Sequence, residues 1–455
     1  MAYSTAPTEA AHTSGGEIGL EAIVDGSPLG SRHAVILLIC ALVAAVDGFD
    51  TQSVALVAPA VSTAWHVDPS HFGMVFAAGL FGSLLGALAF GVIGDRYGRR
   101  PALLTAVGWF ALVTLTTTLT SSLPGMALAR FFTGLGLGGA LPGIISLASE
   151  YAPLRQRSTL VSVMFCGFPL GAVIGGIASA AIVPALGWQG MFWVSGGITL
   201  LLLPVFARLL PESIRFLALK QDRTGIVRVL ERMGWRHLWN GEMTAATPAR
   251  QSPVAKLFKD GRAPGTILLW VTLFLSLLLT YFLVNWIPLL ARRNGVGMTA
   301  AVLAVATLNG GAIVGCLGIG RLSDRFGRVT RNISVGFALG ALAIALIGTT
   351  GHSSALLLGA TFLAGSLSIG AQMCTVAYCA SFYETSLRAT GVGWAIGIGR
   401  IGSIIGPLMG GALIASGVAV QSLFIVVGVM SLGSAAAIFT LGRFGIGQAA
   451  SVQRV

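Results

Sequence analysis

Two carboxylates stand three residues apart in an otherwise apolar stretch of the chain. Asp47 and Asp50 lie within residues 33–63, where most neighbours are hydrophobic or small. Residues i and i+3 share one face of a helix, so the two side chains lie within reach of each other. Because two carboxylates in a poorly hydrated site do not both ionise cheaply, at least one should take up a proton. Reversible protonation at such a position is the chemistry of a proton-coupled carrier.

Elimination leads to the same pair. Among the 16 Asp and Glu residues, Asp47 and Asp50 alone lie deep within an apolar stretch, whereas Glu150, Glu384 and Asp68 fall at helix ends or in a loop. All six histidines also fall in tails, loops or helix ends. A charge buried in a membrane costs about 2.5–3.5 kcal/mol, so its presence favours a function. The alternative is a structural pair that is hydrogen-bonded to a neighbouring helix.

Two arginines lie within apolar stretches as well. Helix geometry places Asp47 ~21 Å above the inner membrane surface and Arg130 ~8 Å below the outer one, which are matching depths in a core of ~30 Å. Protonation of an aspartate partner would free Arg130 for a substrate carboxylate; the alternative is a permanent ion pair. Arg400 falls near the midplane, and a guanidinium is the natural bidentate partner of a carboxylate. Its alternative is neutralisation by a backbone carbonyl or by packing.

Aromatic and amide side chains within the apolar stretches are further candidates for a substrate site. Each could stack on a ring or hydrogen-bond to it, although aromatic residues near helix ends more often mark the membrane interface. The candidates are Tyr281, Trp286, Asn309, Gln372, Tyr378 and Trp394.

Composition defines the setting of these residues. The 455 residues are 55% hydrophobic and 10% charged, against about 25% charged in soluble proteins, and they include 62 glycines that suit close helix packing in lipid. The sequence therefore predicts an all-α integral membrane protein. Its twelve expected membrane helices span residues 33–63, 70–93, 101–121, 125–149, 158–184, 188–207, 265–290, 298–320, 330–349, 354–380, 389–416 and 420–442.

The distribution of basic residues predicts the orientation. Of 28 Lys and Arg, 24 fall in segments on one side and only Arg292 and Arg293 on the other, which places both termini in the cytoplasm. This asymmetry accounts for the net charge of +12 without nucleic acid. We expect a disordered tail (1–31), two pseudo-symmetric six-helix bundles (32–209 and 264–443), a linker between them (210–263) and a second tail (444–455). The linker should contain an amphipathic helix near 225–234, lying on the membrane surface.

The two bundles repeat a short loop after their second helix. Asp95, Arg96, Gly98 and Arg99 in the first copy correspond, 229 residues later, to Asp324, Arg325, Gly327 and Arg328. We interpret both copies as cytoplasmic gates; the alternative is a topology determinant with a tight glycine turn. Duplicated six-helix halves are a transporter plan, with the binding site between the halves.

These motifs together resemble the major facilitator superfamily. Asp47-Gly-Phe-Asp50-Thr51 is similar to the signature of its aromatic acid:proton symporters, as are residues 129–142, 210–213, 388–394 and 399–400. The resemblance implies two bundles alternating access around a central cavity, and import of benzoate-, hydroxybenzoate- or hydroxyphenylpropionate-type acids with protons by a monomer in the inner membrane. Helix five has Ala172 where drug:proton antiporters carry a proline, which argues against export.

Several function classes lack their motifs. The sequence contains no Walker A loop, no G-x-S-x-G and no H-E-x-x-H, so we expect no enzyme, cofactor or metal site. The leading hypothesis is proton-coupled uptake of a small aromatic carboxylate. A proton-linked exporter of drugs or aromatic compounds remains an alternative, as does a receptor for aromatic acids, against which the short tail after Arg443 speaks.

Overall fold

The computed structural model describes residues 23–25, 30–153, 156–239 and 254–443, and these are almost entirely helical. The N-terminal bundle contains α2 (Ser31–Trp65), the short η1 (Pro69–His71), α3 (Phe72–Tyr97), α4 (Arg99–Thr117), α5 (Leu123–Tyr151), α6 (Arg157–Phe165), α7 (Gly167–Leu186) and α8 (Gln189–Leu209). The C-terminal bundle contains α11 (Ala263–Arg293), α12 (Met298–Phe326), α13 (Val329–Ile347), α14 (Ser354–Ala364), the π-helical turn η4 (Gly365–Ile369), α15 (Gly370–Phe382), α16 (Thr385–Ala415) and α17 (Val420–Arg443).

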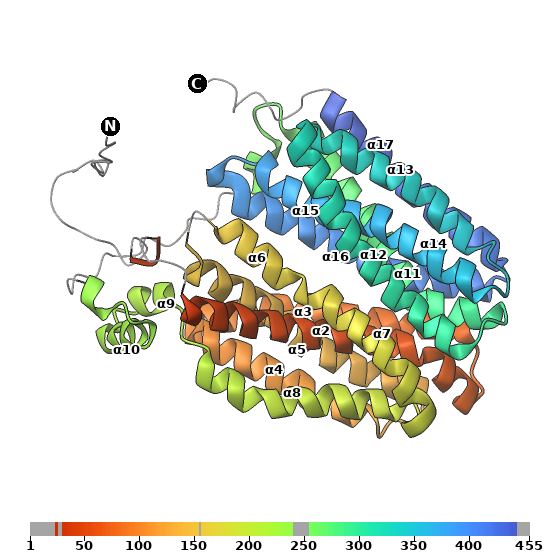
Figure 1. Ribbon diagram of the computed structural model, residues 1–455, viewed down its shortest axis with the longest axis horizontal. Helices are drawn as coiled ribbons and strands as arrows, with labels where there is room; N and C mark the ends of the chain where they lie inside the picture. Colours follow the sequence, from red (N-terminus) through yellow and green to blue (C-terminus); the bar gives the residue numbers. More distant parts are fainter. Residues whose placement is uncertain (1–22, 26–29, 154–155, 240–253, 444–455) are drawn as a thin grey trace, which may run out of the picture.

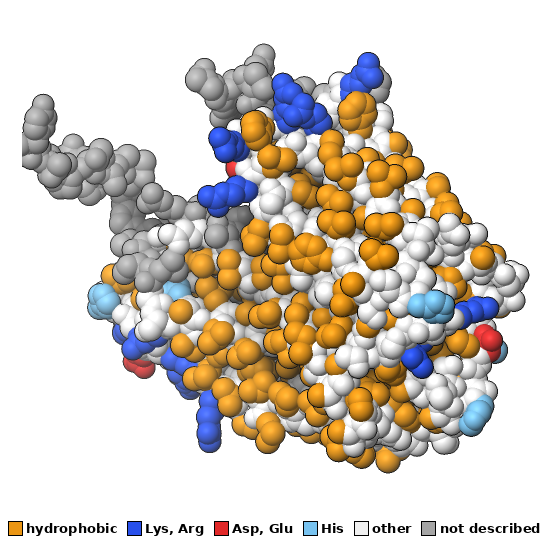
Figure 2. All heavy atoms as spheres, turned by 45° about the vertical axis from the view of Figure 1, so that its right-hand side comes forward, with side chains coloured by type: hydrophobic (Ala, Val, Ile, Leu, Met, Phe, Trp, Pro, Cys, Tyr) orange, Lys and Arg blue, Asp and Glu red, His pale blue; other side chains and the backbone are white. Residues whose placement is uncertain are grey.

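The twelve predicted membrane helices are confirmed within the described residues. Twelve helical segments are long and apolar enough to cross a membrane. A broad apolar surface separates charged side chains at the two ends of the molecule (Figure 2). The fifth helix is not continuous as expected, because it breaks at Cys166 between α6 and α7. Pro169 lacks the N–H that would bond to the carbonyl of Phe165, which removes one helical hydrogen bond at this break.

The two bundles lie side by side along their length (Figure 1). We call the end where α2 begins and α17 ends the proximal end, and the opposite end the distal end. Helices α2, α3 and α7 of the first bundle pack against α11, α16 and α12 of the second. The boundary between the bundles is therefore formed by three helix pairs, and the residues predicted to do chemistry lie on several of these helices.

Three clusters of buried apolar side chains stabilise the molecule. One draws residues from both bundles near the distal end, from Val54 and Phe72 to Trp286 and Leu290. The other two each belong to one bundle, the first around Leu103 and Ile144 with parts of the linker, the second around Phe337 and Tyr383. The bundles thus share a core only near the distal end.

The linker is partly described, with α9 (Ile214–Leu219), α10 (Arg223–Met233), η2 (Arg236–Leu238) and η3 (Val254–Phe258). The amphipathic helix expected near 225–234 is α10, which packs on α9 and η2, and its apolar residues Ile226 and Leu230 are buried in the cluster that includes Leu103 and Ile144. The amphipathic helix therefore forms as expected with its apolar face buried in the protein, and its position on a membrane surface stays a prediction. The predicted tails fall mostly outside the described residues, except that Ile23 and Val24 are helical and buried in the same cluster.

Candidate functional site

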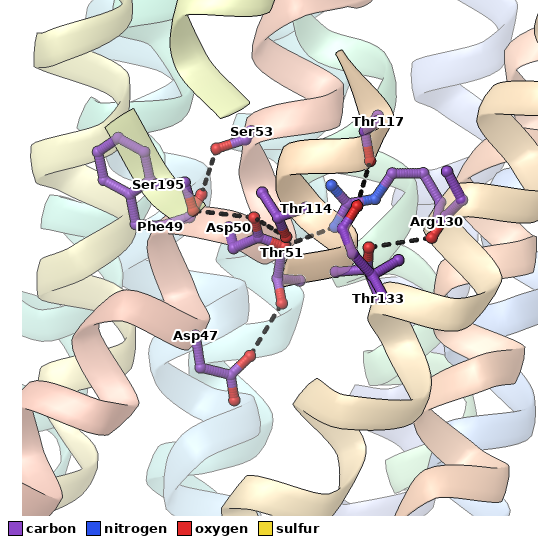
Figure 3. Close-up of polar contacts among 12 residues, drawn as sticks. Asp47, Phe49, Asp50, Thr51, Ser53, Thr114, Thr117, Arg130, Thr133 and Ser195 are labelled. Atoms are coloured by element: carbon purple, nitrogen blue, oxygen red, sulfur yellow. Dashed lines mark hydrogen bonds and ion pairs between the residues drawn. The ribbon is translucent and has the colours of Figure 1, made fainter. Parts of the chain in front are cut away.

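Asp50 is a fully paired carboxylate in the N-terminal bundle. Its side chain is 0% exposed. Thr114 of α4 and Ser195 of α8 donate hydrogen bonds to Oδ1 at 2.9 and 2.8 Å, and Arg130 Nη2 donates to Oδ2 at 2.6 Å (Figure 3). Four helices of one bundle therefore meet at this carboxylate. The buried negative charge is matched by a buried positive charge, as such a site requires.

Arg130 reaches Asp50 from α5. Its side chain is 3% exposed, and the guanidinium lies over the ring of Phe192 at 5.5 Å from the centroid. The predicted pairing of Arg130 with an aspartate of helix one therefore forms, and the partner is Asp50. Among the described residues, Nη1 has no hydrogen-bond partner, and Arg130 lines the central cavity.

Asp47 lies one turn away in a different environment. It is 2% exposed, its Oδ1 accepts a hydrogen bond from Thr51 at 3.1 Å, and its Oδ2 has no partner among the described residues. Figure 3 shows Asp47 apart from the group around Asp50. Asp47 lines the cavity and lies within electrostatic reach of Arg400. One carboxylate of the predicted pair is thus fully paired, and the other lacks a cation at hydrogen-bond distance.

A cavity lies between the two bundles at this level. It contains about 620 Å³ not occupied by protein atoms, part of it open to solvent. Four helices of the first bundle (α2, α3, α5 and α7) and two of the second (α11 and α16) supply its lining. Its apolar walls with few polar groups are typical of a small-molecule site. The lining residues are Asp47, Thr51, Val54, Val75, Phe76, Gly79, Leu80, Ser83, Arg130, Gly134, Leu137, Leu141, Phe168, Tyr281, Val284, Asn285 and Arg400.

Arg400 of α16 enters the cavity from the C-terminal bundle. Its Nη1 donates a hydrogen bond of 2.9 Å to Ser83 Oγ of α3, so this contact joins the two bundles. No carboxylate lies within ion-pair distance of Arg400 among the described residues. Its guanidinium is thus hydrogen-bonded to a neutral group.

The predicted aromatic residues divide into one on the cavity and three away from it. Tyr281 lines the cavity. Trp286 is 0% exposed in the distal cluster and donates its indole N–H to α16. Trp394 stacks on Trp270 at 6.0 Å between centroids, and Tyr378 packs against a phenylalanine of its own helix. The last three do not line the cavity.

The two predicted amides also lie away from the cavity. Asn309 forms reciprocal hydrogen bonds with Gln52, of 2.9 and 3.2 Å, which join α12 to α2 across the bundle boundary. Gln372 is 9% exposed within α15. Neither residue is among those that line the cavity.

Sequence reasoning missed several lining residues, above all Phe76, Ser83, Phe168 and Asn285. Phe168 reaches the cavity because α7 packs tightly on α2, where a Cβ on Gly48 would lie 2.0 Å from the Phe168 carbonyl oxygen. The sequence contained part of the information needed for α3. Phe76 and Ser83 are seven residues apart and so share a helix face, which indicates that both side chains point to the same neighbour.

The two copies of the repeated loop lie at the proximal ends of their helices. In the first, Asp95 pairs with Arg99 at 2.5 Å, and Glu212 accepts a hydrogen bond from the Arg100 backbone N–H. In the second, Asp324 forms no ion pair among the described residues. Each copy ends its helix with a glycine in the positive-φ region, Gly98 at +113° and Gly327 at +64°.

The other basic residues of these loops lie outside such pairs. Arg96 and Arg325 each lie over the aromatic ring that follows them, at 5.4 and 5.8 Å from the centroids. Arg328 precedes α13 and is exposed. The copies therefore share a glycine with positive φ and an arginine–aromatic contact, and they differ in the conformation of that glycine and in the pairing of their acid.

Comparisons with known proteins agree with this architecture. The family model for the Major Facilitator Superfamily matches residues 40–398 and 311–448. The gallate transporter of Pseudomonas putida is 36% identical over 92% of this chain and 94% of its own. The 3-(3-hydroxy-phenyl)propionate transporter of Escherichia coli is 37% identical over 85% of this chain and 88% of its own. The structure of the xylose transporter XylE of E. coli aligns with a TM-score of 0.70 at 18% identity, covering 90% of this chain and 98% of its own.

Proposed function

This chain belongs to the Major Facilitator Superfamily, and within it we propose that the protein imports a small aromatic carboxylate together with protons. The chain is a membrane transporter and not an enzyme. The names of its relatives support an aromatic acid as the substrate. The proximal end would face the cytoplasm, in the inner membrane of a bacterium, and one chain would carry out the cycle.

The charge balance of the cavity carries this proposal. Arg130 and Arg400 bring two positive charges, and Asp47 and Asp50 bring two negative ones, so the site is neutral when both acids are ionised. Asp50 is matched by Arg130, which leaves Asp47 as the group that sets the net charge. Once Asp47 takes up a proton, the site has one excess positive charge and attracts one carboxylate. Substrate binding and proton binding are then coupled.

Arg400 is the proposed partner of the substrate carboxylate. Its single hydrogen bond to the neutral Ser83 hydroxyl can be exchanged for a bidentate ion pair with a carboxylate, which adds an opposite charge and a second N–H···O bond. Arg130 is held by Asp50 and would have to break a buried ion pair, which costs several kcal/mol. Phe76, Phe168 and Tyr281 supply flat walls for a ring.

The proposed cycle follows from these roles. With the distal end open, Asp47 takes a proton and Arg400 binds the carboxylate. The bundles then close distally and open proximally, where the repeated loops act as gates. Loss of the proton from Asp47 restores its attraction for Arg400 and releases the substrate.

The test is uptake into proteoliposomes under an imposed inward proton gradient, with benzoate, the hydroxybenzoates and 3-(3-hydroxyphenyl)propionate as substrates. The wild type should accumulate a member of this set above equilibrium. Asp47→Asn mimics the protonated acid, so it should still exchange substrate across the membrane but fail to concentrate it. Asp68→Asn makes the same chemical change away from the cavity and should concentrate normally. Accumulation by Asp47→Asn would refute the role of Asp47, and outward pumping by the wild type would favour an exporter.

A further inference from the structure

The cavity has a second polar end that the proposed carboxylate site does not use. Asn285 of α11 lines the cavity and is 4% exposed. Its Nδ2 donates a 2.7 Å hydrogen bond to the backbone carbonyl of Tyr281, one turn earlier in the same helix. One N–H of the amide is engaged by its own helix, and the group that Asn285 offers to a hydroxyl proton is the oxygen Oδ1, a hydrogen-bond acceptor.

The two polar ends lie at different depths. Arg400 donates to Ser83 of α3, and Phe76 lies seven residues nearer the distal end of α3, a rise of about 10 Å. The Phe76 ring packs edge-on against Trp286, with 5.5 Å between centroids, and Trp286 directly follows Asn285. Asn285 therefore lies about 10 Å distal to the Ser83 hydroxyl that Arg400 contacts.

The walls between these ends are apolar. Val54, Val75, Leu80 and Val284 are the apolar aliphatic residues of α2, α3 and α11 that line the cavity. A benzene ring with a carboxylate at one end and a hydroxyl at the other, hydrogen-bonded at each end, spans a distance of the same order. The cavity thus presents a cation, an apolar slot and an acceptor in that order.

We propose that Asn285 Oδ1 accepts a hydrogen bond from a ring hydroxyl of the substrate, so that the transporter selects aromatic acids hydroxylated meta or para to the acid group. This inference rests on the proposed function, because it needs the carboxylate at Arg400. An unsubstituted ring would leave the amide oxygen unpaired in a nearly dry site. A site of this kind discriminates strongly against the analogue that lacks the hydroxyl.

The experiment compares benzoate with 2-, 3- and 4-hydroxybenzoate as competitors of uptake by the wild type, Asn285→Leu and Tyr281→Phe. Wild type should prefer the 3- or 4-hydroxy acid over benzoate by about tenfold or more. Asn285→Leu should abolish that preference in two ways: the 3- and 4-hydroxy acids should bind more weakly, and benzoate should bind at least as tightly as before because no amide oxygen is left unpaired. 2-Hydroxybenzoate should behave like benzoate, because its hydroxyl lies beside the carboxylate. The variant should fold, since the Tyr281 carbonyl still lies within the hydrogen-bonded helix.

Three outcomes would overturn the inference. In the first, Asn285→Leu keeps the preference. In the second, it weakens binding of all four acids equally, which would indicate that the cavity is damaged and that Asn285 does not recognise the ring hydroxyl. Tyr281→Phe, which removes the neighbouring hydroxyl and keeps the ring, could abolish the preference in place of Asn285→Leu. Failure of the proposed function is distinct, because the wild type would then be inhibited by none of the four acids.

Discussion

The distal and proximal ends of this transporter are packed in different ways. At the distal end, one apolar cluster contains side chains of both bundles, and Phe76 of the first meets Trp286 of the second. Nearer the proximal end, each bundle has a cluster of its own, and the N-terminal one also includes the linker helix α10. The structure is therefore closed distally.

This difference indicates which contacts must break during transport and which must stay intact. Each bundle keeps its own core, so it can move as a rigid body. The distal contacts are the ones that must break and re-form: the shared apolar cluster, a backbone contact of α3 with α16 and an amide pair between α2 and α12, with a weak attraction between Asp68 and Arg293 at the rim. Their strength should set how much of the protein is open distally.

The largest effect is expected where the backbones touch. A Cβ on Gly73 would lie 2.8 Å from the Pro407 carbonyl oxygen and 3.3 Å from the Cα of Gly411. Gly73→Val should therefore prevent distal closure, at a cost of about 3 kcal/mol or roughly hundredfold in the closed population. Uptake should be lost, and a cysteine placed at the buried Leu290 should become reactive to a maleimide.

Gly91 of the same helix is the matched control. A Cβ there has nothing within 4 Å, so Gly91→Val should leave uptake and labelling unchanged. Normal uptake by Gly73→Val would show that the glycine contact is not needed for closure.

An intermediate effect is expected from the amide pair. Gln52→Leu leaves the buried side-chain oxygen of Asn309 without its partner, which costs about 1–3 kcal/mol and should reduce the closed population roughly tenfold. Labelling at Leu290 should rise accordingly. Gln52→Leu combined with Asn309→Leu removes both polar groups and should restore part of the closure. If the free-energy effects of the two single substitutions simply added in the double variant, the two amides would not be energetically coupled.

The proximal end should respond differently, because its contacts lie within one bundle. Glu212 accepts hydrogen bonds from the backbone N–H groups of Arg100 and Ser213, at 3.0 and 2.9 Å. Glu212→Gln should lower the free energy of unfolding by about 1 kcal/mol, measured by thermal denaturation in detergent, without changing distal labelling. Glu384→Gln, at an exposed pair with Arg262 in the other bundle, should have less effect. Increased distal labelling in Glu212→Gln would show that the two ends are coupled.

Much of the fold could be predicted because membrane helices are recorded in local composition. The lengths of the apolar stretches predicted the twelve helices. Helix geometry alone placed Arg130 at the same depth in the membrane as Asp47 of the first helix. The break before α7 could also have been inferred, since Pro169 cannot complete the hydrogen-bond pattern at that point.

The different environments of Asp47 and Asp50 could not be predicted, because they depend on neighbours that are distant in sequence. Asp47 and Asp50 share a helix face, and what separates them is Thr114 and Ser195, which lie on other helices and both donate to Asp50. Asn309 likewise looked like a substrate ligand, whereas its partner is an amide 257 residues away. Pairing across helices is a property of tertiary packing and leaves little signal in local sequence.

The smallest effect is expected at the distal rim. The Ser70 hydrogen bond to its carboxylate holds the pKa of Asp68 below its ordinary value, and the charges of His71 and Arg293 act in the same direction. Because Arg293 ends α11, this attraction crosses the bundle boundary. A lowered pKa in the folded state means that the stabilisation is complete above the unfolded value of about 3.9 and is lost as the pH falls through the folded one. Asp68→Asn should therefore flatten the fall in thermal stability between about pH 5 and pH 3, by a few tenths of a kcal/mol at most since Asp68 is exposed to solvent. Added salt should reduce the part due to Arg293 but leave the Ser70 bond. An unchanged pH profile in Asp68→Asn would mean that neither contact stabilises the folded protein.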